Sequence, residues 1–151
     1  MTPAQREDVR QRAGQRCEYC RLPDSAMDPA DFHVEHIVAI KHGGSDNEDN
    51  LAWACIFCNL YKGPNLASLD PDTGELTRLF HPRQDRWEDH FRFEDASIIG
   101  ITAVGKTTCW LLELNSEVLR TLRMNLMREQ LTTYEPDPAK WEADFKKRKR
   151  S

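Results

Sequence analysis

The sequence predicts a small α+β domain that is held together by a bound metal ion. Three observations lead to this fold class. The N-terminal segment carries the end signals of a helix, two apolar β-type runs in the middle of the chain are followed by a short helical segment, and four of the five cysteines form two C-x2-C pairs. The length of 151 residues suits one domain with a modest core.

The first predicted element is a helix over residues 3–13. Thr2 can cap its N-terminus with Pro3 at the first helical position, and Gly14 can adopt the left-handed conformation that ends a helix. The helix carries three arginines that can face either solvent or a phosphate backbone, namely Arg6, Arg10 and Arg12. A solvated charged face is the commoner outcome for such a pattern.

Two strands and a helix are predicted in the middle of the chain. Residues 32–38 alternate and are rich in apolar or β-branched side chains, which is typical of a strand. Residues 41–50 contain two glycines and many Asp and Asn residues and are expected to form a loop. A second short strand is predicted over 51–54, and a helix over 56–62 ends at the Gly-Pro pair of residues 63–64.

The rest of the chain predicts a smaller α+β extension and a basic tail. A strand is expected at 76–80, a brief helix at 85–91, and a hairpin formed by 91–93 and 97–101. Ser116 can cap a final helix whose apolar residues recur at spacings near 3.6.

These elements divide the chain into three parts. They are a core of residues 1–66, an extension of residues 67–135 packed on that core, and a tail of residues 136–151 that is expected to be disordered.

The two cysteine pairs predict a structural zinc site. Cys17 and Cys20 are separated by 34 residues from Cys55 and Cys58. Thiolates are soft ligands that suit zinc, and a two-residue spacer lets one tight turn present both sulfurs to one ion. Four protein ligands leave no open position for water, so this zinc is expected to support the fold. Cys109 is left over and is expected to be a buried thiol.

The segment between and around these cysteines carries a recognisable pattern. It consists of His33-Val34-Glu35-His36-Ile37, then Gly43-Gly44, then Asn50-Leu51, then Cys58-Asn59-Leu60-Tyr61-Lys62-Gly63. Over about residues 17–64 this pattern resembles the zinc-bearing HNH endonucleases. The resemblance implies a ββα-metal fold stapled by the four-cysteine zinc site, with a small C-terminal hairpin-plus-helices extension. The sequence departs from many family members by having Glu at position 35 instead of Asp, and Ala39 instead of Pro.

The resemblance implies hydrolysis of phosphodiester bonds in nucleic acid, with double-stranded DNA as the expected substrate. His36 would be the general base, since an unperturbed imidazole titrates at about 6.5. Glu35 and Asn59 offer hard oxygen ligands for a catalytic Mg²⁺ or Mn²⁺. Asn50 would hold the loop backbone and thereby orient the base.

Two further residues are candidates for substrate contact. Lys62 lies one helical turn beyond Asn59 and could meet a phosphate, or it could be a solvated lysine. His33 shares a strand face with Glu35, so it could approach the substrate or the metal, or it could make a structural hydrogen bond. Because neighbouring residues of a strand point to opposite faces, Glu35 and His36 can serve one site only if the strand ends or kinks at His36.

Charge and composition limit the partners. The formal net charge is −4, which is unusual for a protein that binds nucleic acid, but residues 1–22 carry a balance of +2 and residues 139–151 a balance of +4. No apolar run is long enough to cross a bilayer, and the N-terminus has no signal-peptide core, so a cytoplasmic protein without a membrane partner is expected. The oligomeric state is not readable.

Two competing interpretations stay open. Residues 100–107 satisfy the phosphate-loop expression G-x4-G-K-[ST], but only 44 residues follow, which leaves no room for a parallel sheet; we therefore expect a packing helix there. The alternative to a nuclease is a catalytically silent zinc-framed module that binds DNA or protein.

Overall fold

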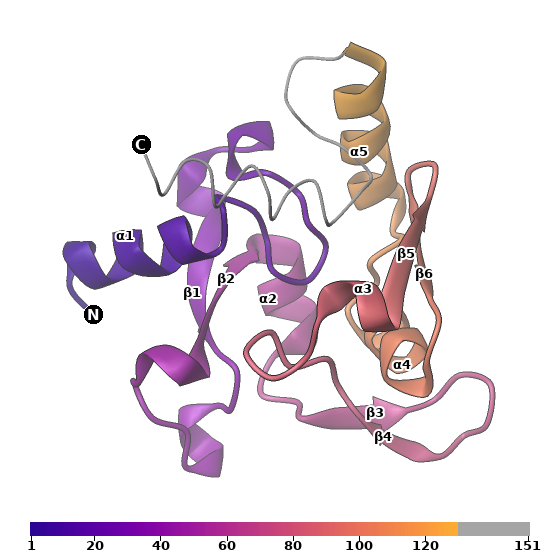
Figure 1. Ribbon diagram of the computed structural model, residues 1–151, viewed down its shortest axis with the longest axis horizontal. Coiled ribbons are helices and arrows are strands. Elements are labelled where there is room, and N and C mark those ends of the chain that lie inside the picture. The colour runs from indigo at the N-terminus through magenta and orange to yellow at the C-terminus, as the bar shows by residue number, and fades with distance from the viewer. Residues whose placement is uncertain (130–151) are drawn as a thin grey trace.

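The computed structural model describes residues 1–129, which form helices and three separate two-stranded antiparallel sheets. Figure 1 shows the first half of the chain, with α1, β1, β2 and α2, on one side of the molecule and the later elements on the other. This α+β organisation confirms the predicted fold class. The C-terminal end of the last predicted helix, and the whole basic tail, lie outside the described residues.

Helix α1 (Pro3–Arg12) begins and ends as its sequence predicts. Thr2 caps it through a reciprocal capping box with Gln5, and Gly14 follows the helix with φ of 69°. Val9 is the single buried residue of this helix. Hydrophobic packing alone therefore does not explain how α1 is attached to the rest of the protein. Its arginines attach it to the core, as described below.

The core of the molecule is a hairpin followed directly by a helix. Strand β1 (Phe32–His36) pairs antiparallel with β2 (Leu51–Cys55), and α2 (Ile56–Lys62) begins at the next residue and packs against both strands. Strand β1 ends at His36, two residues earlier than the predicted strand. The strand thus ends where the sequence requires it to end if Glu35 and His36 are to serve one site.

Residues 67–129, the described part of the extension, form two hairpins and three helices. Strands β3 (Ala67–Leu69) and β4 (Leu76–Arg78) form the first hairpin, and β5 (Phe91–Glu94) and β6 (Ser97–Gly100) form the second. The sequence does not predict β3, because its three residues show no recognisable alternation. The helices have the following bounds: α3 (Trp87–His90), α4 (Ala103–Leu111) and α5 (Glu117–Glu129).

One hydrophobic cluster joins the two halves of the described chain. Trp53 of β2 stacks on Phe32 of β1 with ring centroids 5.8 Å apart, while Trp87 of α3 packs on Phe91 of β5 at 4.9 Å. Both tryptophans belong to the same buried cluster as Leu119 of α5. The extension is therefore continuous with the packing that supports β1, β2 and α2.

Candidate active site and zinc centre

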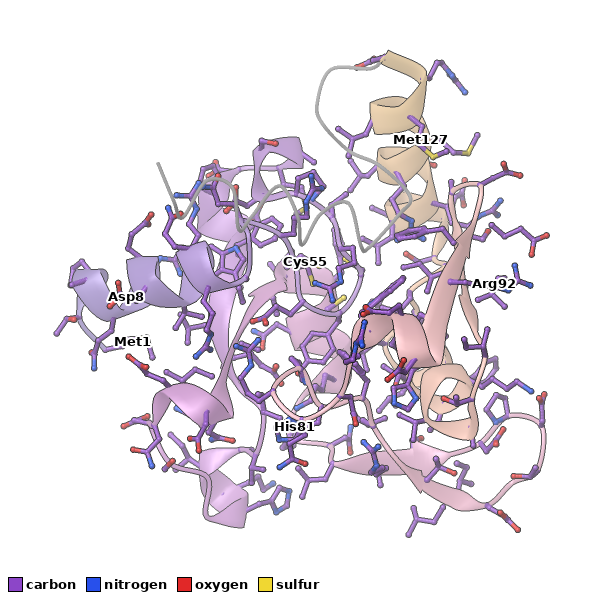
Figure 2. All side chains as sticks on the ribbon, viewed as in Figure 1. Met1, Asp8, Cys55, His81, Arg92 and Met127 are labelled. Carbon is purple, nitrogen blue, oxygen red and sulfur yellow. The ribbon has the colours of Figure 1, made fainter. Side chains whose placement is uncertain are left out.

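The four paired cysteines converge on one point. Their ligand atoms all lie within 4.8 Å of one another, and all four residues are fully buried. Cys55 is the residue that caps α2, and its sulfur accepts a hydrogen bond from the Cys58 backbone N–H at 3.5 Å. The Cys20 N–H donates in the same way to the sulfur of Cys17. Figure 2 shows Cys55 near the centre of the molecule.

The spacing of the sulfurs fits a tetrahedral zinc ion. Zinc at about 2.3 Å from each of four thiolates places neighbouring sulfurs about 3.8 Å apart. The sulfurs of Cys20 and Cys55 are 3.7 Å apart. The four cysteines are therefore positioned to hold a structural zinc that ties the Cys17–Cys20 turn to the start of α2.

Glu35 lies beside this centre and is almost completely enclosed. Its side chain is 4% exposed, and its Oε1 forms an ion pair with the Lys62 Nζ at 2.5 Å. Its Oε2 accepts a hydrogen bond from the Tyr19 hydroxyl, also at 2.5 Å. Burial raises the pKa of Glu35, whereas the Lys62 charge and the two hydrogen bonds act in the opposite direction.

Lys62 occupies a position that neither sequence alternative describes. Its side chain is 2% exposed, and its ammonium group contacts both Glu35 and the backbone carbonyl of Ile37, the latter at 2.9 Å. Lys62 is the last residue of α2, so these contacts join the end of the helix to the end of β1. In this structure the ammonium reaches the interior of the site and not its surface.

His36 lies at the solvent-facing side of the same strand end. Its side chain is 25% exposed, and its Nε2 lies 2.7 Å from Oδ1 of Asp46, whose side chain is 81% exposed. A carboxylate can only accept, so in the neutral ring Nε2 carries the hydrogen and Nδ1 keeps the lone pair. Sequence reasoning missed Asp46; the only available signal was the acidic composition of the loop that contains it.

Asn50 fastens that loop to the end of β1. Its side-chain oxygen accepts from the Val38 N–H at 2.9 Å, and its amide nitrogen donates to the carbonyls of Val38 at 3.0 Å and Ser45 at 2.8 Å. Gly44 lies inside this loop, where a side-chain Cβ would overlap the Val38 carbonyl. These contacts hold the backbone on both sides of the segment that leads from His36 to Asp46.

Asn59 and His33 are both half-buried. Asn59 lies in α2 one turn before Lys62, so the two share a helix face. Its side chain makes no hydrogen bond to any other of residues 1–129, which leaves its amide oxygen available as a ligand. His33 pairs in register with Ala54 of β2 and likewise makes no side-chain hydrogen bond to the described part of the chain.

Two of the predicted site residues have the chemistry of ligands for a divalent cation. Glu35 and Asn59 offer the kind of oxygen atoms that Mg²⁺ and Mn²⁺ prefer. In this structure the Lys62 ammonium supplies the counter-charge of the Glu35 carboxylate. A divalent ion that bound Glu35 would take over a position that now belongs to Lys62.

The arginines of α1 are used inside the molecule. Arg6 donates to the Phe32 carbonyl at 3.0 Å, and its guanidinium lies 4.6 Å from the centre of the Trp53 ring. Arg12 donates to the carbonyl of Leu51, and Arg10 forms an ion pair with Asp24 at 2.7 Å. The three side chains thus fasten α1 to the β1–β2 hairpin and its connections, so they form neither a solvated face nor a free phosphate site.

The phosphate-loop expression falls on a different structure. Gly100 ends β6, and α4 begins only three residues later, so Lys106 and Thr107 lie within the helix instead of opening it. Lys106 pairs with Asp72 at 2.9 Å, and Thr107 is fully buried. The segment therefore lacks the glycine-rich loop that would surround a phosphate, and it packs as the expected helix.

Among residues 1–129, every helix is too short or too polar to cross a membrane.

Comparison with known proteins agrees with this arrangement over the core. The family model of the HNH endonucleases matches residues 17–65, which run from the first zinc cysteine to just beyond α2. No curated protein and no solved structure matches the chain.

Proposed function

Because residues 17–65 carry an HNH endonuclease domain, we propose that this protein is a metal-dependent endonuclease that hydrolyses phosphodiester bonds in double-stranded DNA. What carries the proposal is the match of residues 17–65 to the HNH endonuclease family model, in which Glu35 and His36 end β1 and Asn59 lies on α2, the helix that packs against β1. A nuclease needs a base for water, positive charge near the phosphate, and groups that hold both in place. The residues around this junction can meet each need.

His36 is the proposed general base. Its hydrogen bond to Asp46 leaves Nδ1 able to accept a proton from water. The oxygen of that water attacks the phosphorus, the bond from phosphorus to the 3′ oxygen breaks, and the departing oxygen takes a proton from solvent. The products are a 5′-phosphate and a 3′-hydroxyl. Asn50 orients the base by holding the loop from Val38 to Ser45.

Glu35 and Asn59 are the proposed ligands of Mg²⁺ or Mn²⁺. When bound there, the ion would supply positive charge to the phosphate and to the departing oxygen. Glu35 is held by Tyr19 and Lys62, and Asn59 by its place in α2. Lys62 and His33 remain proposed contacts to the substrate. For Lys62, such contact requires its ammonium to leave Glu35.

Nicking of supercoiled plasmid tests this function. We expect wild-type protein to nick in Mg²⁺ or Mn²⁺, and His36→Ala to be slower by a factor of about 100 or more. His42→Ala is the matched control, because His42 is exposed in the same loop region, and it should cut like wild type. If wild-type protein is inert in every metal, or if His36→Ala cuts equally well, the alternative of a catalytically silent DNA- or protein-binding module stands instead.

A further inference from the structure

Tyr19 is a buried side chain that links three parts of the molecule. It lies between the zinc ligands Cys17 and Cys20 and is fully enclosed. Its hydroxyl donates to Oε2 of Glu35 at 2.5 Å. Because a carboxylate only accepts hydrogen bonds, the Tyr19 hydroxyl is the donor in this contact.

Residues of the extension also contact the turn between Cys17 and Cys20. The indole N–H of Trp87, in α3, donates to the backbone carbonyl of Tyr19 at 2.8 Å, and the ring of Phe80 meets the Tyr19 ring edge-on at 6.3 Å. The neighbouring Glu18 forms an ion pair with Arg83 and accepts a hydrogen bond from the Trp53 N–H at 2.7 Å. Tyr19 is therefore fixed by groups that lie more than 60 residues away in the sequence.

These contacts form a chain of direct interactions into the candidate site. Trp87 holds the backbone of Tyr19, the Tyr19 hydroxyl holds one oxygen of Glu35, and Lys62 holds the other oxygen together with the Ile37 carbonyl. Glu35 alone, at the end of a two-stranded hairpin, would be free to rotate about its side-chain bonds. With one donor on each oxygen, its carboxylate has a single orientation.

On the basis of the proposed function, we propose that Tyr19 is a positioning residue that sets the orientation of Glu35 for metal binding. The Cys17–Cys20 turn thus influences catalysis through the Tyr19 hydroxyl. Residues 67–129 influence catalysis indirectly, because they hold this turn in place. Groups that orient a metal ligand from behind typically change metal affinity or activity by a factor of about 10 to 100 when they are removed.

The test is Tyr19→Phe, which removes one oxygen and keeps the ring. We expect Mn²⁺ binding, measured by electron paramagnetic resonance, to weaken about 10-fold, and the single-turnover nicking rate to fall about 10-fold. The KM for plasmid should stay within about twofold, because Tyr19 touches no substrate. Tyr61→Phe is the matched control, since Tyr61 lies exposed on α2, and it should behave like wild type in every assay.

The outcomes separate this proposal from the proposed function. If wild-type protein nicks and Tyr19→Phe equals it in rate and in Mn²⁺ affinity, the positioning role is overturned while the nuclease function stands. If wild-type protein does not nick, the nuclease function fails, and the Mn²⁺ titration alone decides whether Tyr19 orients Glu35. If Tyr19→Phe loses its zinc or unfolds, the hydroxyl serves the fold instead of Glu35, and the proposal is overturned.

Discussion

Lys62 and Glu35 form an ion pair that is almost completely buried. This burial determines how much either residue contributes to the stability of the fold. Removing one partner of such a pair leaves an uncompensated charge in the interior, which costs far more than losing an exposed ion pair. The pair also joins the last residue of α2 to the end of β1. Its loss should therefore be felt as instability of the whole core.

Lys62→Met tests this energetic role. We expect it to lower the free energy of unfolding by about 3 to 5 kcal/mol, because the Glu35 carboxylate loses its counter-charge. Urea denaturation measures the difference. Lys41→Met is the control; Lys41 is exposed, and its substitution should change the free energy by no more than about 0.5 kcal/mol. Equal effects of the two substitutions would contradict the assignment of Lys62 as a buried partner.

Asn50→Ala tests the attachment of the loop. The substitution leaves the N–H and carbonyl of Val38 without their side-chain partner, so we expect a loss of about 1 to 3 kcal/mol of stability and a slower nicking rate. Asn47→Ala serves as the control, because the exposed Asn47 side chain does not cap the turn that follows it. An Asn50→Ala protein with wild-type stability and rate would show that the loop needs no such fastening.

At the scale of single residues, the sequence predicts the zinc ligands better than it predicts which side chains contact one another. The cysteine spacing identifies all four sulfur ligands, because one turn geometry brings each C-x2-C pair together. The burial of Lys62 was not predictable, since its contacts to Glu35 and Ile37 arise from how α2 packs on β1. Tyr19 was missed for the same reason, because nothing local marks a tyrosine as the donor to a carboxylate 16 residues away.

At the scale of helices and strands, the four-cysteine centre provides stability that a small hydrophobic core cannot supply. Strands β1 and β2 form only a two-stranded hairpin, which is marginally stable by itself in water. Its second strand ends in Cys55 and runs directly into α2, so a zinc ion held by the four cysteines would fix the strand, the helix and the Cys17–Cys20 turn at one point.

Loss of zinc should therefore unfold the domain. We expect Cys58→Ser to retain no stoichiometric zinc and to show an unfolded circular dichroism spectrum, since structural zinc sites contribute on the order of 10 kcal/mol. Cys109→Ser is the matched control. Burial raises the pKa of the Cys109 thiol to about 12, and it lies outside the cysteine cluster, so this variant should keep one zinc per chain and its fold. A folded, zinc-free Cys58→Ser protein would contradict the role given to the ion.

The helices and hairpins of the extension illustrate which elements a single sequence can predict. The hairpin of β5 and β6 follows from apolar patterns and turn residues and lies within a few residues of its expected bounds, and α4 is the packing helix that was expected after it. Strand β3 has only three residues and exists because it pairs with β4, so its own sequence contains little signal. The extension reaches the Cys17–Cys20 turn through the contact of Trp87 with Tyr19. No sequence pattern predicts that contact.

For the whole molecule, the distribution of charge decides how it could bind DNA. The arginines of α1 contact backbone carbonyls, Asp24 and the Trp53 ring, so they are not free to neutralise phosphates. The segment of residues 139–151, whose structure is outside the described residues, has six Lys or Arg against two acids. On charge alone, this segment is the strongest source of phosphate contacts in the sequence.

Salt dependence of DNA binding tests that expectation. Changing the five basic residues of positions 146–150 to Gln should weaken binding and reduce the slope of log K against log salt by up to about 4.5, since each lost phosphate contact changes it by about 0.9. Arg10→Gln, which removes a guanidinium already paired with Asp24, should leave the slope unchanged. The reverse result would place the phosphate contacts on α1.

In the proposed active site, the end of β1 and the face of α2 together hold a divalent ion beside His36. Anomalous diffraction from crystals soaked in Mn²⁺ tests it most directly. We expect one strong peak about 2.1 Å from an oxygen of Glu35 and from the side-chain oxygen of Asn59. The Lys62 ammonium should then be displaced from Glu35. A peak bound elsewhere, in crystals of active protein whose Glu35 still pairs with Lys62, would contradict it.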